Sequence, residues 1–472
     1  MRKTDTIAAI ATGLTDSGIG IVRISGTDAI EVGNRIFKLP SGRRILSRAV
    51  SHMLYYGFAV DDGEDLVIDE VMAVVMASPR SFTGENTVEI QCHGGVYVMK
   101  KILDTALKCG ARLAEPGEFT RRAFLNGRMD LSMAEAVMDV IQSQNKYALV
   151  SSVNQLRGAL SDKIKSLRSK VLYEIAFIES ALDDPEHFDL EDYPEELADK
   201  LTVLTDEIGG LIAASWNGRL IKEGIRTVIV GKPNAGKSSL LNCLVGEERA
   251  IVTEIAGTTR DVLQESVRLG EIILNVVDTA GIRSTEDTVE RIGVEKARKY
   301  AGDADLILYV ADASVSLDEN DREIVSLIKD KNVIVLLNKS DLENRVTAES
   351  MEKLFQESGK PLQESGKPLI IKTSARDGEG MRELEESIKN IFFQGNIRSS
   401  HEMVITNMRH KEALEEAYQS LMLVKKSIGE GLPEDFYSID LMNAYSCLGR
   451  IIGEEVDDDL VEEIFSKFCM GK

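Results

Sequence analysis

Apolar residues follow two different periodicities along the chain. In the first 118 residues, short apolar runs such as Val71–Met76 alternate with helix-like segments such as Gly95–Leu103. From Leu131 the apolar residues recur every three or four positions, which is the spacing of one face of a helix. A second long helix is predicted at Leu156–Leu182. The pattern therefore predicts an N-terminal α/β domain followed by a helical domain.

A second set of strand-like runs follows the first helical part. These runs are Arg226–Val230, Ile272–Val277, Val333–Leu337 and Leu369–Lys372. Helical periodicity returns in residues 413–428 and 441–452, so an α/β segment interrupts the helical pattern. We expect the two helical parts to pack together, with the α/β domain inserted between them. The expected domains are residues 1–118, 119–215, 216–392 and 393–472, of which the second and fourth form one discontinuous helical domain.

A phosphate-binding loop lies between a predicted strand and a predicted helix. Gly231–Ser238 fits the pattern G-x-x-x-x-G-K-S, and Ser239–Leu244 reads as the start of a helix. Such a loop directs backbone N–H groups and a helix N-terminus at phosphate oxygens. Lys237 is expected to reach the β- and γ-phosphates, and the Ser238 hydroxyl to bind Mg²⁺. The inserted domain is therefore predicted to be a Ras-like P-loop domain.

The segment Asn338–Asp341 identifies the base. It fits N-K-x-D and follows a buried strand run. The Asp341 carboxylate can accept hydrogen bonds from guanine N1–H and the exocyclic amine, whereas adenine presents the opposite donor pattern and would leave that acceptor unpaired. Ser374–Arg376 follows the next strand as backbone support for the base. The predicted nucleotide is GTP.

Two segments between these motifs have the positions of GTPase switches. Asp278–Gly281 ends a predicted strand, where Asp278 would bind Mg²⁺ through water and the Gly281 amide would sense the γ-phosphate. Gly257–Asp261 is the expected first switch, with Thr259 as an Mg²⁺ ligand. Both are expected to order on GTP binding and to be released on hydrolysis.

The position that carries a water-orienting Gln in small GTPases is Ile282, which cannot orient water. Either GTP hydrolysis is slow or another group supplies this function. The nearest polar candidates are Arg283, Glu286, Asp287 and Glu290.

Length, cysteine usage and charge restrict the remaining classes. A chain of 472 residues predicts about three domains. We expect a cytoplasmic protein without a membrane span, since there is no apolar run of about 18 residues and no secretory pattern. Five scattered cysteines favour a reducing compartment over disulfides or structural zinc.

The net charge of −22 argues against nucleic-acid binding, but residues 1–130 carry 16 basic and 16 acidic residues and are neutral. Within them, the basic clusters Arg43–Arg44 with Arg48 and Arg121–Arg122 with Arg128 are candidates for contact with phosphates.

Further motifs resemble one family over nearly the whole chain. They are Asp5–Thr12, Gly18–Gly26, Ser81–Glu85 with Glu89, Cys92–Gly95, Pro116–Arg128 and the ending Phe468–Lys472, where Met470 replaces the usual Ile. Together with the GTPase motifs, they resemble the MnmE (TrmE) family of tRNA-modifying GTPases. The resemblance implies an N-terminal folate-binding domain, a discontinuous helical domain and an inserted G domain.

The resemblance implies an answer to the missing Gln, because in the family a K⁺ ion lies where other GTPases receive an arginine finger. Its ligands would be Asn234, Thr253, Ile255 and Thr258. Glu290 matches the residue that orients water, and Arg260, Asp261 and Arg283 match positions needed for turnover. The residues expected to contact GTP are Asn234, Ala235, Gly236, Lys237, Ser238, Ser239, Thr253, Glu254, Ile255, Ala256, Gly257, Thr258, Thr259, Asp278, Thr279, Ala280, Gly281, Asn338, Lys339, Asp341, Ser374, Ala375 and Arg376.

The resemblance also implies a site for a one-carbon tetrahydrofolate, formed by Arg23, Glu89, Arg128 and Lys472. Two arginines suit the glutamate tail of a folate, and a carboxylate suits the amidine-like edge of the pterin. Cys469 lies beside this ending, and nucleophilic chemistry there is the less favoured interpretation.

The implied function is that of a homodimeric, K⁺-stimulated GTPase with a flavin-dependent partner of the MnmG (GidA) type. The pair would install a folate-derived aminomethyl-type (carboxymethylaminomethyl) group at C5 of the tRNA wobble uridine. Two alternatives stay open. One is a regulatory GTPase of ribosome assembly, of the Era or Der type, although nothing in the chain resembles a KH motif. The other is a folate-binding protein whose GTPase controls stability.

Overall fold

The computed structural model describes residues 5–61, 63–184, 192–247, 264–277, 302, 304–328, 331–358, 368–393, 405–456, 458–468 and 471. The chain forms two compact units. Unit 1 contains residues 1–141, 152–205 and 413–472, and unit 2 contains residues 142–151 and 206–412.

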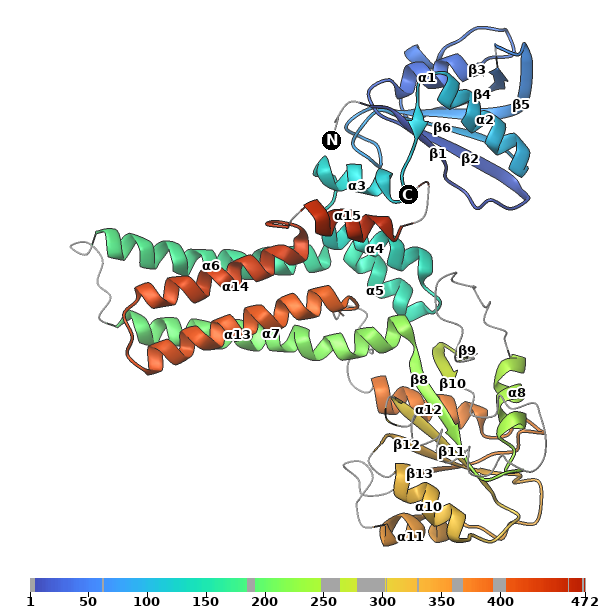
Figure 1. Ribbon diagram of the computed structural model, residues 1–472, viewed down its shortest axis with the longest axis vertical. Helices are drawn as coiled ribbons and strands as arrows, with labels where there is room; N and C mark the ends of the chain where they lie inside the picture. Colours follow the sequence, from blue (N-terminus) through green and yellow to red (C-terminus); the bar gives the residue numbers. More distant parts are fainter. Residues whose placement is uncertain are drawn as a thin grey trace. The chain divides into compact units, whose positions relative to one another are not determined.

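The N-terminal part of unit 1 is a sheet backed by two helices (Figure 1). Its strand order is β3-β4-β5-β6-β2-β1-β7, and neighbouring strands are antiparallel except β1 and β7, which are parallel. The elements are β1 Ile7–Ile10, β2 Ser17–Ser25, α1 Ala29–Ile36, β3 Phe37–Lys38, β4 Leu54–Asp61, β5 Leu66–Met76, β6 Thr87–Gly94, α2 Val96–Lys108 and β7 Arg112–Leu113.

The two faces of this sheet carry different residues. On the face covered by α1 and α2, Val22 and Ile90 are buried in one core with Met99. Side chains alternate along a strand, so Arg23 and Glu89, which are paired across β2 and β6, lie on the other face. This second face therefore carries two of the four residues of the predicted folate site, Arg23 and Glu89.

The rest of unit 1 is helical. Its elements are α3 Glu118–Leu125, α4 Leu131–Gln142, α5 Lys146–Leu156, α6 Ala159–Asp183, α7 Tyr193–Glu223, α13 Met408–Gly429, α14 Asp435–Ile452 and α15 Asp458–Ser466, although the last residue of α4 and parts of α5, α7 and α13 belong to unit 2. Helix α14 packs on α6, and α13 lies along α7 (Figure 1). The predicted packing of two helical parts that are distant in sequence is therefore confirmed.

The predicted helix Leu156–Leu182 is wrong at its beginning. Helix α5 ends at Leu156, and α6 begins at Ala159 after Gly158, which has a φ of 95°. A glycine tolerates this left-handed conformation, which other residues adopt only with strain, so the chain changes direction there.

Unit 2 contains a P-loop α/β domain. Its sheet has the order β13-β12-β11-β8-β10-β9, with parallel neighbours except the antiparallel hairpin of β9 and β10. Its elements are β8 Ile225–Val230, α8 Lys237–Glu247, β9 Gln264–Leu269, β10 Ile272–Val277, β11 Leu306–Asp312, α10 Glu319–Ile328, β12 Val333–Asn338, α11 Ala348–Glu357, β13 Leu369–Lys372 and α12 Met381–Phe393. One apolar core lies on each face of this sheet.

The predicted fold class, multidomain α/β plus α with an inserted P-loop domain, is confirmed, while the boundaries at residues 118, 215 and 392 stay predictions. Within the described ranges, no helix is long and apolar enough to cross a membrane.

Candidate functional sites

The phosphate-binding loop turns tightly between β8 and α8. Gly231 has a φ of 153°, and a Cβ there would lie 2.2 Å from the Val310 carbonyl oxygen of β11. The Lys237 ammonium donates to the carbonyls of Gly231 and Lys232, at 2.7 Å each. Burial lowers the pKa of Lys237. The loop thus surrounds a partly buried cation at the N-terminus of a helix, an arrangement that suits phosphate oxygens.

The N-K-x-D segment, Asn338–Asp341, is bonded directly to this loop. Asn338 is only 2% exposed, and its Nδ2 donates to the Ala235 carbonyl at 2.8 Å. Its Oδ1 accepts from the Ala375 backbone N–H at 3.2 Å. One side chain therefore joins the loop, the end of β12 and the segment after β13, three segments that the sequence places far apart.

Two further contacts orient the residues of the N-K-x-D segment. Lys339, at a φ of 64°, forms an ion pair with Asp312 at 2.5 Å. The Ser374 hydroxyl lies 3.2 Å from Asp341 Oδ1 and 2.8 Å from Asp377 Oδ2. The Asp341 carboxylate is thus supported at the point where the sequence predicts guanine. Asn234, Ser238, Ser239 and Arg376 are exposed around this site.

Several predicted site residues lie outside the described residues. They are Thr253, Glu254, Ile255, Ala256, Gly257, Thr258, Thr259, Arg260, Asp261, Asp278, Thr279, Ala280, Gly281, Arg283, Glu290 and Lys472, together with Cys469. Within the described part of the chain, no group of three or more His, Cys, Asp and Glu side chains is arranged to hold a metal ion.

A second candidate site lies on the face of the N-terminal sheet opposite α1 and α2. Arg23 Nε contacts Glu89 Oε1 at 2.8 Å, and both side chains are mostly buried. Arg23 Nη1 also donates to the Gly471 carbonyl at 3.3 Å. The structure therefore brings together two predicted folate residues and the end of the chain. Arg128 is exposed in the turn after α3, and within the described residues no polar contact joins it to this pair.

Sequence reasoning did not identify the aromatic side chains of this site. The guanidinium carbon of Arg23 lies 5.5 Å from the centre of the Phe82 ring and 5.6 Å from that of Phe119. Both rings belong to motifs that carried the family resemblance, Ser81–Glu85 and Pro116–Arg128, and this membership was the signal that could have identified them. Arginine is attracted to aromatic faces, so these rings help to hold the guanidinium in place.

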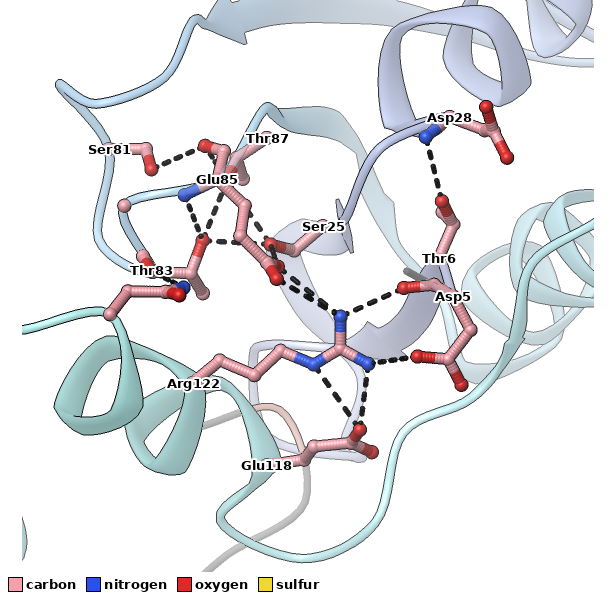
Figure 2. A network of polar contacts seen from close by, with 12 residues as sticks. Asp5, Thr6, Ser25, Asp28, Ser81, Thr83, Glu85, Thr87, Glu118 and Arg122 are labelled. Carbon is pink, nitrogen blue, oxygen red and sulfur yellow. Dashed lines mark hydrogen bonds and ion pairs between the residues drawn. The ribbon is translucent and has the colours of Figure 1, made fainter. Parts of the chain in front are cut away.

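The prediction that Arg121 and Arg122 meet phosphates is wrong for Arg122. Its guanidinium is surrounded by the carboxylates of Asp5, Glu85 and Glu118 (Figure 2). Arg121 is mostly buried and lies 3.8 Å from Glu462 of α15. Charge in sequence did not distinguish an arginine paired inside the fold from one that faces solvent.

Two family models match the chain. "GTP-binding protein TrmE N-terminus" matches residues 6–128, which include the N-terminal sheet and α3. "MnmE helical domain" matches residues 131–469, a span that contains both helical parts and the inserted domain.

Among solved structures, the G domain of the T. maritima FeoB iron transporter is 26% identical, with a TM-score of 0.26, and covers 36% of this chain and 99% of its own. A tRNA modification GTPase MnmE of Lachnoclostridium phytofermentans is 56% identical over 470 residues, covering 100% of both chains. The protein of the same description from Bacillus subtilis is 45% identical over 469 residues, covering 99% of this chain and 100% of its own. With full-length identity at this level, the chain belongs to the MnmE family of tRNA modification GTPases.

Proposed function

We propose that this GTPase is stimulated by K⁺ and acts with a flavin-dependent partner of the MnmG (GidA) type. In the cytoplasm, the pair would install a folate-derived aminomethyl-type group at C5 of the tRNA wobble uridine. The observation that carries the folate part is the Arg23 guanidinium, which lies between the Glu89 carboxylate and the Gly471 carbonyl. A buried carboxylate with a fixed orientation suits the hydrogen-bond donors on the edge of a pterin.

The contact between Arg23 and Glu89 refines the roles of the folate residues. A pterin and a glutamate tail are the opposite ends of a folate, and Arg23 lies 2.8 Å from Glu89. Arg23 would therefore serve the pterin end with Glu89 and orient its carboxylate. Arg128, which is exposed, and Lys472 would remain for the negatively charged tail.

In the G domain, Asp341 would bind guanine, and the Lys237 ammonium would exchange its loop carbonyls for the β- and γ-phosphates. Asn234 has a φ of 60° and an exposed side chain within the loop, so its amide oxygen is accessible to a cation. Asn234, Thr253, Ile255 and Thr258 would hold K⁺, which supplies positive charge beside the β–γ bridge, and Ser238 and Thr259 would hold Mg²⁺. Glu290 would orient water, with Arg260, Asp261 and Arg283 supporting turnover.

A homodimer is part of the proposal and would form through the N-terminal domain. Leu54 and Tyr56 lie on the same side of β4, opposite the buried Ala59, and each is 47% exposed. Val67 on β5 is 61% exposed. Large exposed apolar side chains on one sheet favour a second copy as the occupant. Sedimentation of Tyr56→Glu should show a monomer, and an unchanged dimer would place the interface elsewhere.

The GTPase part is tested by steady-state hydrolysis with Mg²⁺ in KCl and in NaCl at equal ionic strength. We expect strong stimulation by K⁺ that is lost in Asn234→Ala. Equal rates in both salts would contradict the K⁺ mechanism. Glu290→Ala should abolish hydrolysis and leave GTP binding nearly intact, whereas retained turnover would remove Glu290 from the mechanism.

The modification itself is tested with a tetrahydrofolate labelled in its one-carbon unit, tRNA, GTP and the flavoprotein. Label should enter the tRNA only with all components present, and Arg23→Ala should abolish incorporation while GTP hydrolysis continues. If no label enters the tRNA when the unmodified protein and all other components are present, the alternative of a regulatory GTPase is favoured.

A further inference from the structure

Arg122 is the centre of a largely buried ionic network that joins three segments of unit 1 (Figure 2). Its side chain is 11% exposed. Nη2 lies 2.7 Å from Asp5 Oδ1 and 2.9 Å from Glu118 Oε1, and Nη1 donates to the Asp5 carbonyl at 2.8 Å. Nη1 also lies 3.3 Å from both carboxylate oxygens of Glu85. The guanidinium thus connects the residues before β1, the segment before β6 and helix α3.

Glu85 extends this network to the strand that carries Arg23. The Ser25 hydroxyl donates to Glu85 Oε2 at 2.9 Å and lies 2.8 Å from Thr83 Oγ1. Ser25 is two residues from Arg23 on β2, so both side chains lie on the same face of the sheet. The network therefore ends beside the Arg23–Glu89 pair.

Helix α3, which carries Arg122, also supplies one wall of that site. Phe119 is completely buried, with its ring 5.6 Å from the Arg23 guanidinium carbon. At the start of the helix, Gly117 has a φ of 67°, and a Cβ there would lie 2.5 Å from the Phe465 carbonyl oxygen of α15. Helix α3 therefore packs against Arg23 on one side and against the last helix on the other.

We propose that Arg122 is a positioning residue for the Arg23–Glu89 site. By holding α3 against the sheet, it fixes Phe119 behind Arg23 and carries α15, and with it the end of the chain, to the Arg23 guanidinium. The proposal rests on the proposed folate function and extends it to a residue that does not touch the folate. Arginine suits this position because one planar group with five donors can bridge three carboxylates, whereas a lysine ammonium has three donors at a single point.

Arg112 provides a matched control. It contacts Asp5 and Glu118, as Arg122 does, but its side chain is 42% exposed, and none of its contacts within the described residues reaches Glu85. Replacement of Arg112 by Gln therefore removes charge from the same two carboxylates without cutting the connection to Ser25.

The experiment compares Arg122→Gln and Arg112→Gln in the full-length protein. Binding of 5-formyltetrahydrofolate, an air-stable reduced folate, is measured by calorimetry, and hydrogen exchange is measured for residues 118–125 and 458–468. We expect Arg122→Gln to weaken folate binding by about tenfold or more, the equivalent of at least one lost charged hydrogen bond, and to speed exchange in both segments. Arg112→Gln should change the affinity for folate by less than about threefold, because an exposed ion pair contributes little. The rate of GTP hydrolysis should be unchanged in both variants.

Equal folate affinities in the two variants, or unchanged exchange in Arg122→Gln, would overturn the proposal. If the unmodified protein binds no folate, the folate function fails, and the exchange of α3 and α15 still decides whether Arg122 holds these helices. Should Arg122→Gln fail to fold, Glu85→Gln replaces it, because it keeps the shape of the side chain but weakens both the ion pair and the bond from Ser25. Glu85→Gln is expected to weaken folate binding more than Arg112→Gln does, and the reverse order would contradict the proposal.

Discussion

The side-chain amide of Asn338 donates to the backbone carbonyl of Ala235, which lies 103 residues earlier, at 2.8 Å. The N-K-x-D segment and the phosphate loop are therefore one hydrogen-bonded unit. A ligand that binds the loop must also depend on the position of the N-K-x-D segment.

Replacement of Asn338 by Ala should weaken nucleotide binding even though the phosphate loop is unchanged. It leaves the Ala235 carbonyl and the Ala375 N–H without this partner, and each buried unpaired group costs about 1–3 kcal/mol. We expect the dissociation constant for a fluorescent GDP analogue to rise about tenfold to a hundredfold. Asn320→Ala, on the exposed surface of α10, is the control. Unchanged affinity in Asn338→Ala would mean that the two segments are held by other contacts.

Gly236 is expected to reject any side chain. Its φ is 97°, and a Cβ would lie 2.1 Å from Asn338 Nδ2. Gly236→Ala should therefore abolish measurable GDP binding. Gly378→Ala shares the positive φ, 74°, but its Cβ would meet nothing within 4 Å, so it should cost only the backbone strain of about 1–2 kcal/mol. Thermal unfolding measures the cost of the backbone strain, and GDP titration measures the loss of binding caused by the clash with Asn338. If both variants lose the same amount of stability and of GDP affinity, backbone strain alone explains the effect of Gly236→Ala.

Lys232 should anchor the phosphate loop through its ion pair with Asp321. Its ammonium lies 2.7 Å from Asp321, which is 1% exposed and also accepts from the Tyr309 hydroxyl at 2.7 Å. Lys232→Met leaves that carboxylate buried without its cation, at a cost of about 3–5 kcal/mol, and should weaken GDP binding. Asp321→Asn in addition should restore part of the stability, since the buried charge is then gone.

The control for this experiment is Arg322→Met, because the Arg322–Glu319 pair is exposed and such pairs contribute about 0–1 kcal/mol. If the unfolding temperature of Lys232→Met is no lower than that of the control, Lys232 does not anchor the loop.

Unit 1 should lose stability on acidification through the carboxylates around Arg122. Burial raises the pKa of Glu118, but hydrogen bonds from Arg112, the Glu115 N–H and Arg122 outweigh it and hold the pKa below its ordinary value. The pKa of Asp5 is lowered in the same way, against the opposing effect of burial, by Arg112 and Arg122. A lowered folded-state pKa gives stability that is complete above the unfolded pKa and is lost as the pH falls through the folded one.

The loss is therefore expected below about pH 4, where the unfolded carboxylates protonate. Thermal unfolding followed by circular dichroism between pH 3 and 7 should show a smaller acid-induced decrease in Glu118→Gln than in the unmodified protein. Glu115→Gln, an exposed carboxylate three residues away, should behave like the unmodified protein. The same decrease in all three proteins would assign the acid sensitivity to other groups.

Four strands of the inserted domain were predictable to within one residue. Ile272–Val277 and Leu369–Lys372 match β10 and β13, while Arg226–Val230 and Val333–Leu337 miss one residue of β8 and β12. Strands of a parallel sheet covered by helices read as continuous apolar runs, and this made them recognisable. The break at Gly158 was not predictable from periodicity, since the apolar spacing continues through it and the change of direction is a matter of one backbone dihedral angle.

The sequence by itself determined the nucleotide chemistry and the family, because each GTPase motif is contiguous and its function depends on local backbone shape. Tertiary structure alone decided which charged residues meet. Arg23 contacts Glu89 and the carbonyl of Gly471, 448 residues later, while Arg122 faces three carboxylates from different segments. Strand register and helix packing determine such partners. Both are set by the burial of apolar side chains that are distant in sequence, so the residues around each charged side chain do not reveal its partner.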